Sequence, residues 1–337
     1  MANPLVELGQ YGQSPWLDNI SRGLIASGQL RALIDDDGLK GVTSNPAIFE
    51  KSITGSTDYD TAIEQLAAQN KTAMDIYESL AMEDIQSAAD VLRSVYEATN
   101  GRDGFVSLEV SPYLADDTEG TIEEGRRLWQ AVDRNNVMIK VPATEAGIPA
   151  VRQLISEGLN INVTLMFSFA VYEAVAEAYI AGLEDRAAQG CDLSGINSVA
   201  SFFISRIDTL VDDLLEKRAG EAVSDLEQEK IRGLFGQVAI ANGTVTYQRY
   251  KELFTSARWQ KLADKGAKTQ RVLWASTSTK NPDYRDVLYV EELIGQDTIN
   301  TLPDATLDAF RDHGRLSSTL EDGLTEARAI MHTVAEI

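Results

Sequence analysis

The sequence predicts a single α/β domain in which eight parallel strands and their helices form a (β/α)8 barrel of the TIM type. Short segments rich in β-branched residues alternate with amphipathic helices from one end of the chain to the other. This alternation is typical of a parallel sheet with helical crossovers. Eight such segments occur, which is the number that closes this barrel, and 337 residues suffice to bury its large core.

The expected strands are short and largely apolar, and most are followed by a helical pattern. In order along the chain they are residues 15–19, 39–45, 104–111, 136–142, 160–167, 198–204, 271–277 and 297–302.

The intervals between strands carry helical patterns. Thr121 and Glu124 have the spacing of a capping box, which predicts that a helix begins there. Two intervals, 50–100 after the second strand and 207–270 after the sixth, are longer than a minimal barrel needs and are expected to hold additional helices. No low-complexity linker interrupts them, so the sequence predicts insertions within one domain.

That domain is expected to span residues 1–337. The helical pattern that includes Leu324, Ala327 and Met331 continues to the last residue, Ile337. The sequence therefore predicts a domain that is truncated at its C-terminus.

The charge of the chain limits its partners. Thirty basic and 52 acidic residues give a formal net charge of −22, which argues against a nucleic acid or an anionic membrane as a partner. A small phosphorylated substrate remains compatible, because nearby Arg and Lys side chains act on it more strongly than a distant, screened field.

The composition also argues against a metal site and a secreted protein. One cysteine, Cys191, cannot form an intrachain disulfide, and two histidines are too few for a His/Cys metal site. The N-terminus has no basic segment followed by an apolar stretch, and Glu173 and Glu177 interrupt the longest apolar region, 163–183. We expect a cytoplasmic protein, either a monomer or a homodimer.

Lys140 is the most informative single residue. In the segment NVMIKVPA, Val137, Ile139 and Val141 share one face of a strand and Lys140 lies on the other. An ammonium group inside a strand layer is costly unless it is paired or neutral. A lysine that loses its proton is a nucleophile that can form a Schiff base with a carbonyl. The alternative is a lysine whose ammonium reaches solvent at the end of the strand.

Other expected strands also place polar residues on the face opposite their apolar ones. A packed barrel interior normally holds branched apolar side chains, so a polar set there indicates a site. The alternative is a hydrated barrel mouth without chemistry. The set comprises Asp18, Asn45, Glu109, Lys140, Asn162 and Ser201.

These residue types predict carbonyl chemistry on a sugar phosphate. Lys140 would attack a ketone, and either Asp18 or Glu109 would act as general acid and base. Ser201 and Arg206 flank a junction between strand and helix, where a phosphate can bind. Arg206 could instead form a helix salt bridge with Asp208 or Asp212.

The four tryptophans fall into two pairs. Trp16 and Trp274 share parity with polar residues of their strands and are expected to form walls of the pocket. Trp129 and Trp259 are expected on the core faces of helices.

Several segments resemble the transaldolase family. GVTSNPAIF at 41–49 is similar to its first signature, and NVMIKVPAT at 136–144 is similar to the second, which carries a Schiff-base lysine. VSLEVSP, NINVTLMFSF and SVASFFISRID resemble its third, fifth and sixth strand segments, in the expected order. The long insertion resembles the longer, bacterial-type branch of the family.

The resemblance implies a transferase of the pentose phosphate pathway that needs no metal or cofactor. Such an enzyme moves a dihydroxyacetone unit from sedoheptulose 7-phosphate or fructose 6-phosphate to glyceraldehyde 3-phosphate or erythrose 4-phosphate. By the same resemblance, Lys140 is the Schiff-base lysine, Asp18 the acid and base at the cleaved carbon, and Glu109 the acid that acts through a water. The implied substrate-binding residues are Thr43, Asn45, Asn162, Thr164, Ser201, Phe203 and Arg206.

Two departures and two alternatives accompany this assignment. After the seventh strand many family members have an arginine, whereas this chain reads ASTSTKNP, so Lys280 is assigned to that phosphate contact. Related sugar-phosphate aldolases have a glutamine at the position of Glu109 and a tyrosine at that of Phe203, so transfer is favoured over aldol cleavage. A lyase of the fructose 6-phosphate aldolase type, or a non-catalytic sugar-phosphate-binding barrel, are the alternatives. Members of the longer branch commonly continue beyond the position of Ile337, so a segment over the site is expected to be absent.

Overall fold

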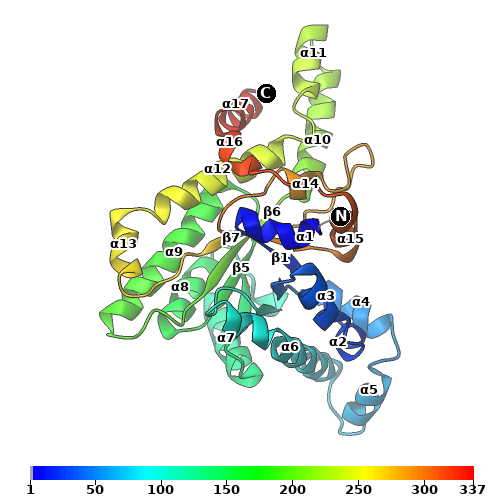
Figure 1. The fold of residues 1–337 in the computed structure, drawn as a ribbon, viewed down its shortest axis with the longest axis vertical. Coiled ribbons are helices and arrows are strands. Elements are labelled where there is room, and N and C mark those ends of the chain that lie inside the picture. The colour runs from blue at the N-terminus through cyan, green and yellow to red at the C-terminus, as the bar shows by residue number, and fades with distance from the viewer. Residues whose placement is uncertain (1–2) are drawn as a thin grey trace.

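The computed structural model describes residues 3–337 and contains a closed barrel of eight parallel strands, as the sequence predicts (Figure 1). Each strand pairs with its neighbours in chain order, and β1 pairs with β8 to close the barrel. All eight expected strands are present, with small differences at their ends. They are β1 (Gln13–Leu17), β2 (Gly41–Val42), β3 (Phe105–Glu109), β4 (Val137–Pro142), β5 (Ile161–Met166), β6 (Ser198–Phe203), β7 (Arg271–Ala275) and β8 (Thr298–Leu302).

Helices surround the strands. Those up to β6 are α1 (Pro4–Glu7), α2 (Arg22–Ala26), α3 (Gln29–Asp37), α4 (Pro46–Thr54), α5 (Asp60–Ala67), α6 (Ala73–Ala98), α7 (Thr118–Val132), α8 (Gly147–Glu157) and α9 (Phe169–Ala188). Those after β6 are α10 (Ser205–Gly220), α11 (Asp225–Arg232), α12 (Val238–Leu253), α13 (Ala257–Ala263), α14 (Leu288–Glu291), α15 (Asp304–His313), α16 (Thr319–Asp322) and α17 (Leu324–Glu336). None of these helices has the length and apolarity that a bilayer span requires.

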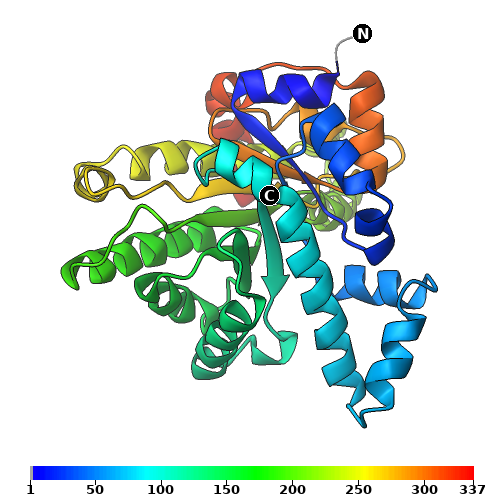
Figure 2. The ribbon, with the colours of Figure 1, turned by 60° about the horizontal axis from the view of Figure 1, so that its bottom comes forward.

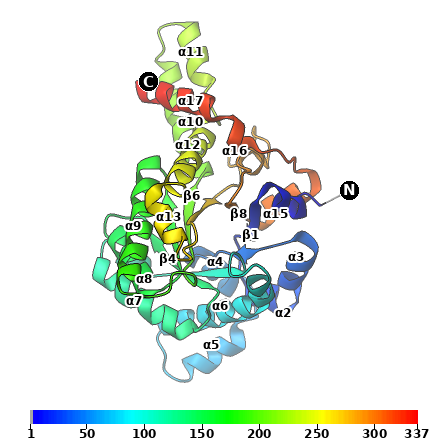
Figure 3. The same cartoon turned by 60° about the vertical axis from the view of Figure 1, so that its left-hand side comes forward.

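The two expected insertions are present. After β2, α4 and α5 precede the long α6, and α5 packs against α6 in a hairpin that extends from the barrel (Figure 2). After β6, α10 to α13 occupy the longer interval, and α11 lies at the opposite end of the molecule from α5 in Figure 1. The C-terminal α17 packs against α12, close to α10 and α11 (Figure 3).

The apolar residues form two main layers. The larger one lies between the strands and the helices and includes Val106, Val137, Ile139 and Val141, as the alternation in the sequence predicts. The smaller one lies inside the barrel, where Phe203 and Ala275 are at the carboxyl ends of β6 and β7 and the other members lie deeper. Those other members are Trp16, Phe105, Met138, Val199, Leu273 and Ile299. The polar residues near the carboxyl ends of the strands therefore lie above a mainly apolar layer.

The expected roles of two tryptophans are corrected. Trp274 packs in the outer layer, edge-on to Phe202, because Leu273 and Ala275 are the residues of β7 that face the interior. Trp16 does face the interior, but it lies in the apolar base, where its Nε1 donates to Asp103 Oδ1 at 3.3 Å. Neither forms a wall of the upper cavity. Trp259 is buried in the outer core, and the partly buried Trp129 packs against that core, as expected.

The sequence predicts that Ile161, Val163, Leu165 and Phe167 share the apolar face of the fifth strand, and β5 departs from this alternation. Its pairing with β6 shifts between Val163 and Met166, and Leu165 has a φ of 63°. A leucine rarely adopts this left-handed conformation. As a result, Met166 enters the core and Leu165 is partly exposed, so the expected inward-outward order fails after Thr164.

The predicted capping box of α7 is also wrong. The helix begins at Thr118 with Asp117 as its N-cap, which accepts a hydrogen bond from Gly120 N. Thr121 lies inside the helix and donates to the carbonyl of Leu114, while Glu124 accepts from Ser111 N. Both side chains instead bond to the segment that follows β3.

The close approach of β2 to Trp16 gives a test of the packing. A Cβ at Gly41 would overlap the Trp16 indole. We expect Gly41→Ala to lower the free energy of unfolding by about 1–3 kcal/mol, as overpacking of a core does, measured by urea denaturation. Gly9→Ala is the control, because a Cβ at Gly9 meets no atom within 4 Å. Equal stability of the two variants would show that Trp16 can move aside.

Candidate active site

A cavity of about 620 Å³ opens at the carboxyl ends of the strands. Residues at the end of, or just after, each of the eight strands line it, which is where TIM barrels place their active sites. The predicted site residues that line the cavity are Asp18, Thr43, Asn45, Glu109, Lys140, Thr164, Ser201, Phe203, Arg206 and Lys280. The structure thus gathers all but one of the predicted residues around one space.

Lys140 is buried inside the barrel beside a carboxylate. Its Nζ lies 3.2 Å from Glu109 Oε2 and donates to the carbonyl oxygen of Ser44 at 3.1 Å. The Lys140 side chain is 8% exposed, so its ammonium does not reach bulk solvent at a strand end. The two residues are direct neighbours in the register of β3 and β4. This arrangement presents an amine and a proton acceptor to the same cavity.

Asp18 lies at the end of β1, and its carboxylate also faces the cavity. Thr43 Oγ1 donates to Asp18 Oδ1 at 2.8 Å. Burial raises the pKa of Asp18, and the charge of Lys140, the Thr43 hydrogen bond and the charge of Arg206 oppose the rise in part. A carboxyl group with a raised pKa is suited to exchange a proton near neutral pH.

Asn162 does not line the cavity. It is fully buried beneath the cavity surface, where its Nδ2 donates to Ser107 Oγ at 2.9 Å and its Oδ1 accepts from Ser201 Oγ at 2.7 Å. Both polar atoms of the amide therefore have protein partners. In this structure Asn162 orients Ser201, and direct binding of substrate by Asn162 remains a prediction.

The β6 and β7 side of the cavity carries the cations that a phosphate needs. The Arg206 guanidinium lies 5.0 Å from the centre of the Phe203 ring. Lys280 Nζ donates to Ser278 Oγ at 2.7 Å, and both residues line the cavity together with Ser276. Hydroxyl groups and two cations thus face one side of the space.

Arg206 is not committed to the helix salt bridge that the sequence left open. Within residues 3–337, neither Asp208 nor Asp212 forms an ion pair with it. Asp208 accepts from Ala239 N and Tyr289 Oη, and Asp212 accepts from Gly236 N and Tyr284 Oη. These bonds hold the Asp208 carboxylate against α12 and α14, and the Asp212 carboxylate against the segments that precede those two helices.

Sequence reasoning missed three residues that contribute to the site. Ser44 supplies the carbonyl that accepts from Lys140, Lys51 of α4 lines the cavity, and so does Thr301 of β8. Thr301 has the same parity as Ile299, which faces the interior, so the alternation of β8 could have identified it. Lys51 lies just beyond the segment 41–49, and a backbone carbonyl such as that of Ser44 leaves no signal in a sequence.

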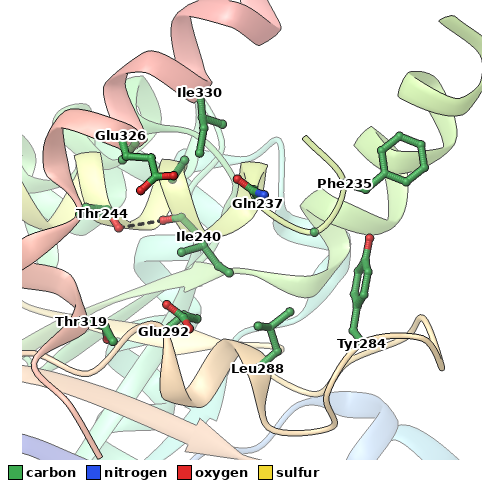
Figure 4. Close-up of a pocket in the computed structure, with 14 residues that line it drawn as sticks. Phe235, Gln237, Ile240, Thr244, Tyr284, Leu288, Glu292, Thr319, Glu326 and Ile330 are labelled. Carbon is green, nitrogen blue, oxygen red and sulfur yellow. Dashed lines mark hydrogen bonds between the residues drawn. The ribbon is translucent and has the colours of Figure 1, made fainter. Parts of the chain in front are cut away.

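A second cavity, of about 420 Å³, lies between α12, α14 and α17 (Figure 4). Ile240, Leu288 and Ile330 form much of its wall, and Glu292 and Glu326 are its charged residues. It has no lysine or arginine among its lining residues and lies outside the barrel. The chemistry of the barrel cavity therefore makes that cavity the candidate site.

Comparison with known proteins agrees with this geometry. A family model described as transaldolase/fructose-6-phosphate aldolase matches residues 15–337. The chain is 51% identical over 335 residues to "Transaldolase 2" of Nostoc sp., covering 99% of this chain and 88% of that protein. It is 48% identical to "Transaldolase" of Trichodesmium erythraeum and 47% identical to "Transaldolase" of Thermobifida fusca, covering all of this chain and 88% and 90% of those proteins.

The raised pKa of Asp18 predicts how this residue affects stability. In the folded protein the Asp18 carboxyl keeps its proton to a higher pH than in the unfolded chain. The pKa of an aspartate in an unfolded chain is about 3.9. The contribution of Asp18 to stability is therefore complete below about pH 4 and is lost as the pH rises through the folded-state pKa. We expect Asp18→Asn to melt at a higher temperature than the wild type at pH 8.

Thermal unfolding followed from pH 4 to pH 8 tests this expectation, and the difference should shrink toward pH 4. Asp116→Asn is the matched control, because it removes one charge from an exposed position and should leave the melting temperature unchanged. A lower melting temperature for Asp18→Asn at pH 8 would mean that the ionised carboxylate stabilises the fold.

Proposed function

The chain belongs to the transaldolase/fructose-6-phosphate aldolase family, and we propose that it is a transaldolase whose nucleophile is Lys140. The observation that carries this proposal is the buried Lys140–Glu109 pair, 3.2 Å apart, inside a cavity that also holds Asp18 and Arg206. A buried amine beside a carboxylate, both open to one cavity, provides the nucleophile and the proton-transfer group that Schiff-base formation requires. The donor would be fructose 6-phosphate or sedoheptulose 7-phosphate, and the acceptor glyceraldehyde 3-phosphate or erythrose 4-phosphate.

The first step joins the enzyme to its donor. The unprotonated amine of Lys140 attacks the ketone carbon, and the ketone oxygen becomes the hydroxyl of a carbinolamine after it accepts a proton. Loss of that hydroxyl as water then gives the Schiff base. Glu109, next to Nζ, takes the proton that nitrogen releases and returns one to the departing oxygen, through a water where the distance requires it.

The second step breaks the carbon–carbon bond. Asp18 takes the proton from the hydroxyl of the carbon to be released, the bond electrons move toward the cationic nitrogen, and an aldose phosphate leaves. A three-carbon enamine remains on Lys140. The enamine then adds to an acceptor aldehyde in the reverse of this step, and Asp18 returns its proton to the new hydroxyl. Hydrolysis of the Schiff base releases a ketose phosphate that is three carbons longer than the acceptor.

The phosphate end of each substrate would lie toward β6 and β7. Arg206 can offer two parallel N–H donors, and Lys280 a point charge. The hydroxyls of Ser201, Ser276 and Ser278 are the neutral groups on this side. Attraction at this short range outweighs the repulsion from a net charge of −22, because salt screens distant charges.

The walls of the cavity favour transfer over hydrolysis. Phe203 lies 5.3 Å from Phe167 between ring centres, and Leu165 also lines the space. Phe203, at the position where the related aldolases have a tyrosine, has no hydroxyl that could protonate the enamine. We propose that the enzyme acts in the cytoplasm as a monomer or homodimer, on small sugar phosphates rather than on nucleic acid or membranes.

Borohydride trapping tests the nucleophile. With fructose 6-phosphate and borohydride, we expect a reduced adduct on the Lys140 peptide by mass spectrometry, because borohydride reduces the Schiff base. Lys140→Met should show no adduct and lose nearly all activity, since both require the amine. Lys51→Met removes another lysine that lines the cavity and should still be trapped. An adduct on another lysine would show that Lys140 is not the nucleophile, and no adduct at all would leave at most a sugar-phosphate-binding barrel.

Product analysis separates transfer from aldol cleavage. With fructose 6-phosphate and erythrose 4-phosphate together, we expect sedoheptulose 7-phosphate to form at least about tenfold faster than free dihydroxyacetone forms from the donor alone. A tenfold preference corresponds to only 1.4 kcal/mol between the two barriers. Equal rates in the two assays would assign the lyase reaction instead.

A further inference from the structure

Thr301 is a buried hydroxyl at the rim of the cavity to which the mechanism above gives no role. It lies on β8, and its Oγ1 is 2.7 Å from Thr43 Oγ1. Thr43 in turn donates to Asp18 Oδ1 at 2.8 Å. The three residues meet because β1 lies between β2 and β8 in the barrel, so the end of β1 is flanked by the ends of both neighbours. Both threonines are 2% exposed, so solvent does not replace these bonds.

The number of hydroxyl protons determines which threonine donates in the hydrogen bond between Thr301 and Thr43. A threonine hydroxyl has one proton to donate. When Asp18 is ionised, Thr43 gives its proton to the carboxylate, so the bond between the two threonines must be donated by Thr301. The two hydroxyls then point in series toward Asp18 Oδ1. Within residues 3–337 no hydrogen bond reaches Oδ2, and Asp18 lines the cavity.

We propose that Thr301 is a positioning residue that acts on Asp18 through Thr43. The serial bonds fix Oδ1 and leave Oδ2 free to exchange a proton with the hydroxyl of the substrate. The inference rests on the proposed transaldolase reaction, in which Asp18 is the acid and base. A bond that is itself supported by a second donor is stronger than an isolated one, by about 10–30%.

The two hydrogen bonds in series act on Asp18 together with several charges. The pKa of Asp18 is raised by burial and by the charge of Asp304, and lowered by Lys140, the Thr43 bond and Arg206. The remaining charged residues that line the same cavity are Lys51, Glu109 and Lys280. Thr301 and Thr43 differ from all of these groups because they are neutral and act through short, oriented hydrogen bonds. Salt does not screen such bonds, so their effect on Asp18 should persist at high salt.

Thr301→Val removes the hydroxyl and keeps the shape of the side chain. We expect kcat/KM to fall about twofold to fivefold, which is the loss of cooperative support for one hydrogen bond to a charged group. The acidic limb of the profile of kcat/KM against pH should move up by about 0.3–0.7 pH units, the same factor on a logarithmic scale. Thr301→Ser keeps the donor and should restore the wild-type profile.

A direct measurement keeps this inference separate from the proposed function. The Cγ resonance of Asp18, assigned by its absence in Asp18→Asn, reports the pKa of the carboxyl group by NMR without turnover. We expect the same upward shift in Thr301→Val and none in Thr301→Ser. Thr246→Val is the control, since Thr246 is buried on α12 and its Oγ1 has no hydrogen-bond partner in the described chain.

Three outcomes would overturn the inference. These are an unchanged profile and resonance in Thr301→Val, an equal loss in the valine and serine variants without a pH shift, and a shift that 1 M salt abolishes. If the wild type catalysed no transfer but the resonance moved as expected, the proposed reaction would fail while the coupling of Thr301 to Asp18 would stand.

Discussion

The burial of one ammonium group constrains the rest of this structure. Removing a charged group from water costs several kcal/mol, and the cost is met only by a partner and by further hydrogen bonds. Lys140 has both, since Glu109 lies 3.2 Å away and the carbonyl of Ser44 accepts a bond. Those partners come from β3 and from the segment after β2. Strands β2, β3 and β4 must therefore pair in the correct register for the buried amine to have these partners.

The interior of the barrel is divided into two levels with different tasks. The lower level is apolar and is closed at the bottom by a buried ion pair between Arg271 and Asp103, 2.8 Å apart, which also holds the Trp16 indole. Above it, the polar side chains meet the cavity. A rigid base of this kind fixes the strand ends, and small displacements there would move Lys140 relative to Asp18.

The helices added after β2 and β6 serve the site as well as the fold. α4 begins at the segment that carries Asn45 and brings Lys51 to the cavity. Arg206 lies in the first turn of α10. Asp208 and Asp212 of the same helix are bound at the starts of α12 and α14 and in the segments before them, so the guanidinium stays free of both carboxylates. The helices that follow β2 and β6 thus supply Lys51 and Arg206 to the cavity, while the strands supply the reacting groups.

The succession of eight strand segments and helices was enough to predict the barrel, and the alternation of residues along the strands predicted that Lys140, Glu109 and several other cavity residues face its interior. It works because neighbouring side chains of a strand point to opposite faces. It failed at Leu165, where the backbone leaves regular strand geometry. It also could not predict how far inside the barrel an inward-facing residue lies, as for Asn162 and Trp16, which are both buried below the cavity. Contacts between distant segments decided the rest, because hydrogen bonds such as that of Thr301 to Thr43 depend on which strand ends the closed barrel brings together.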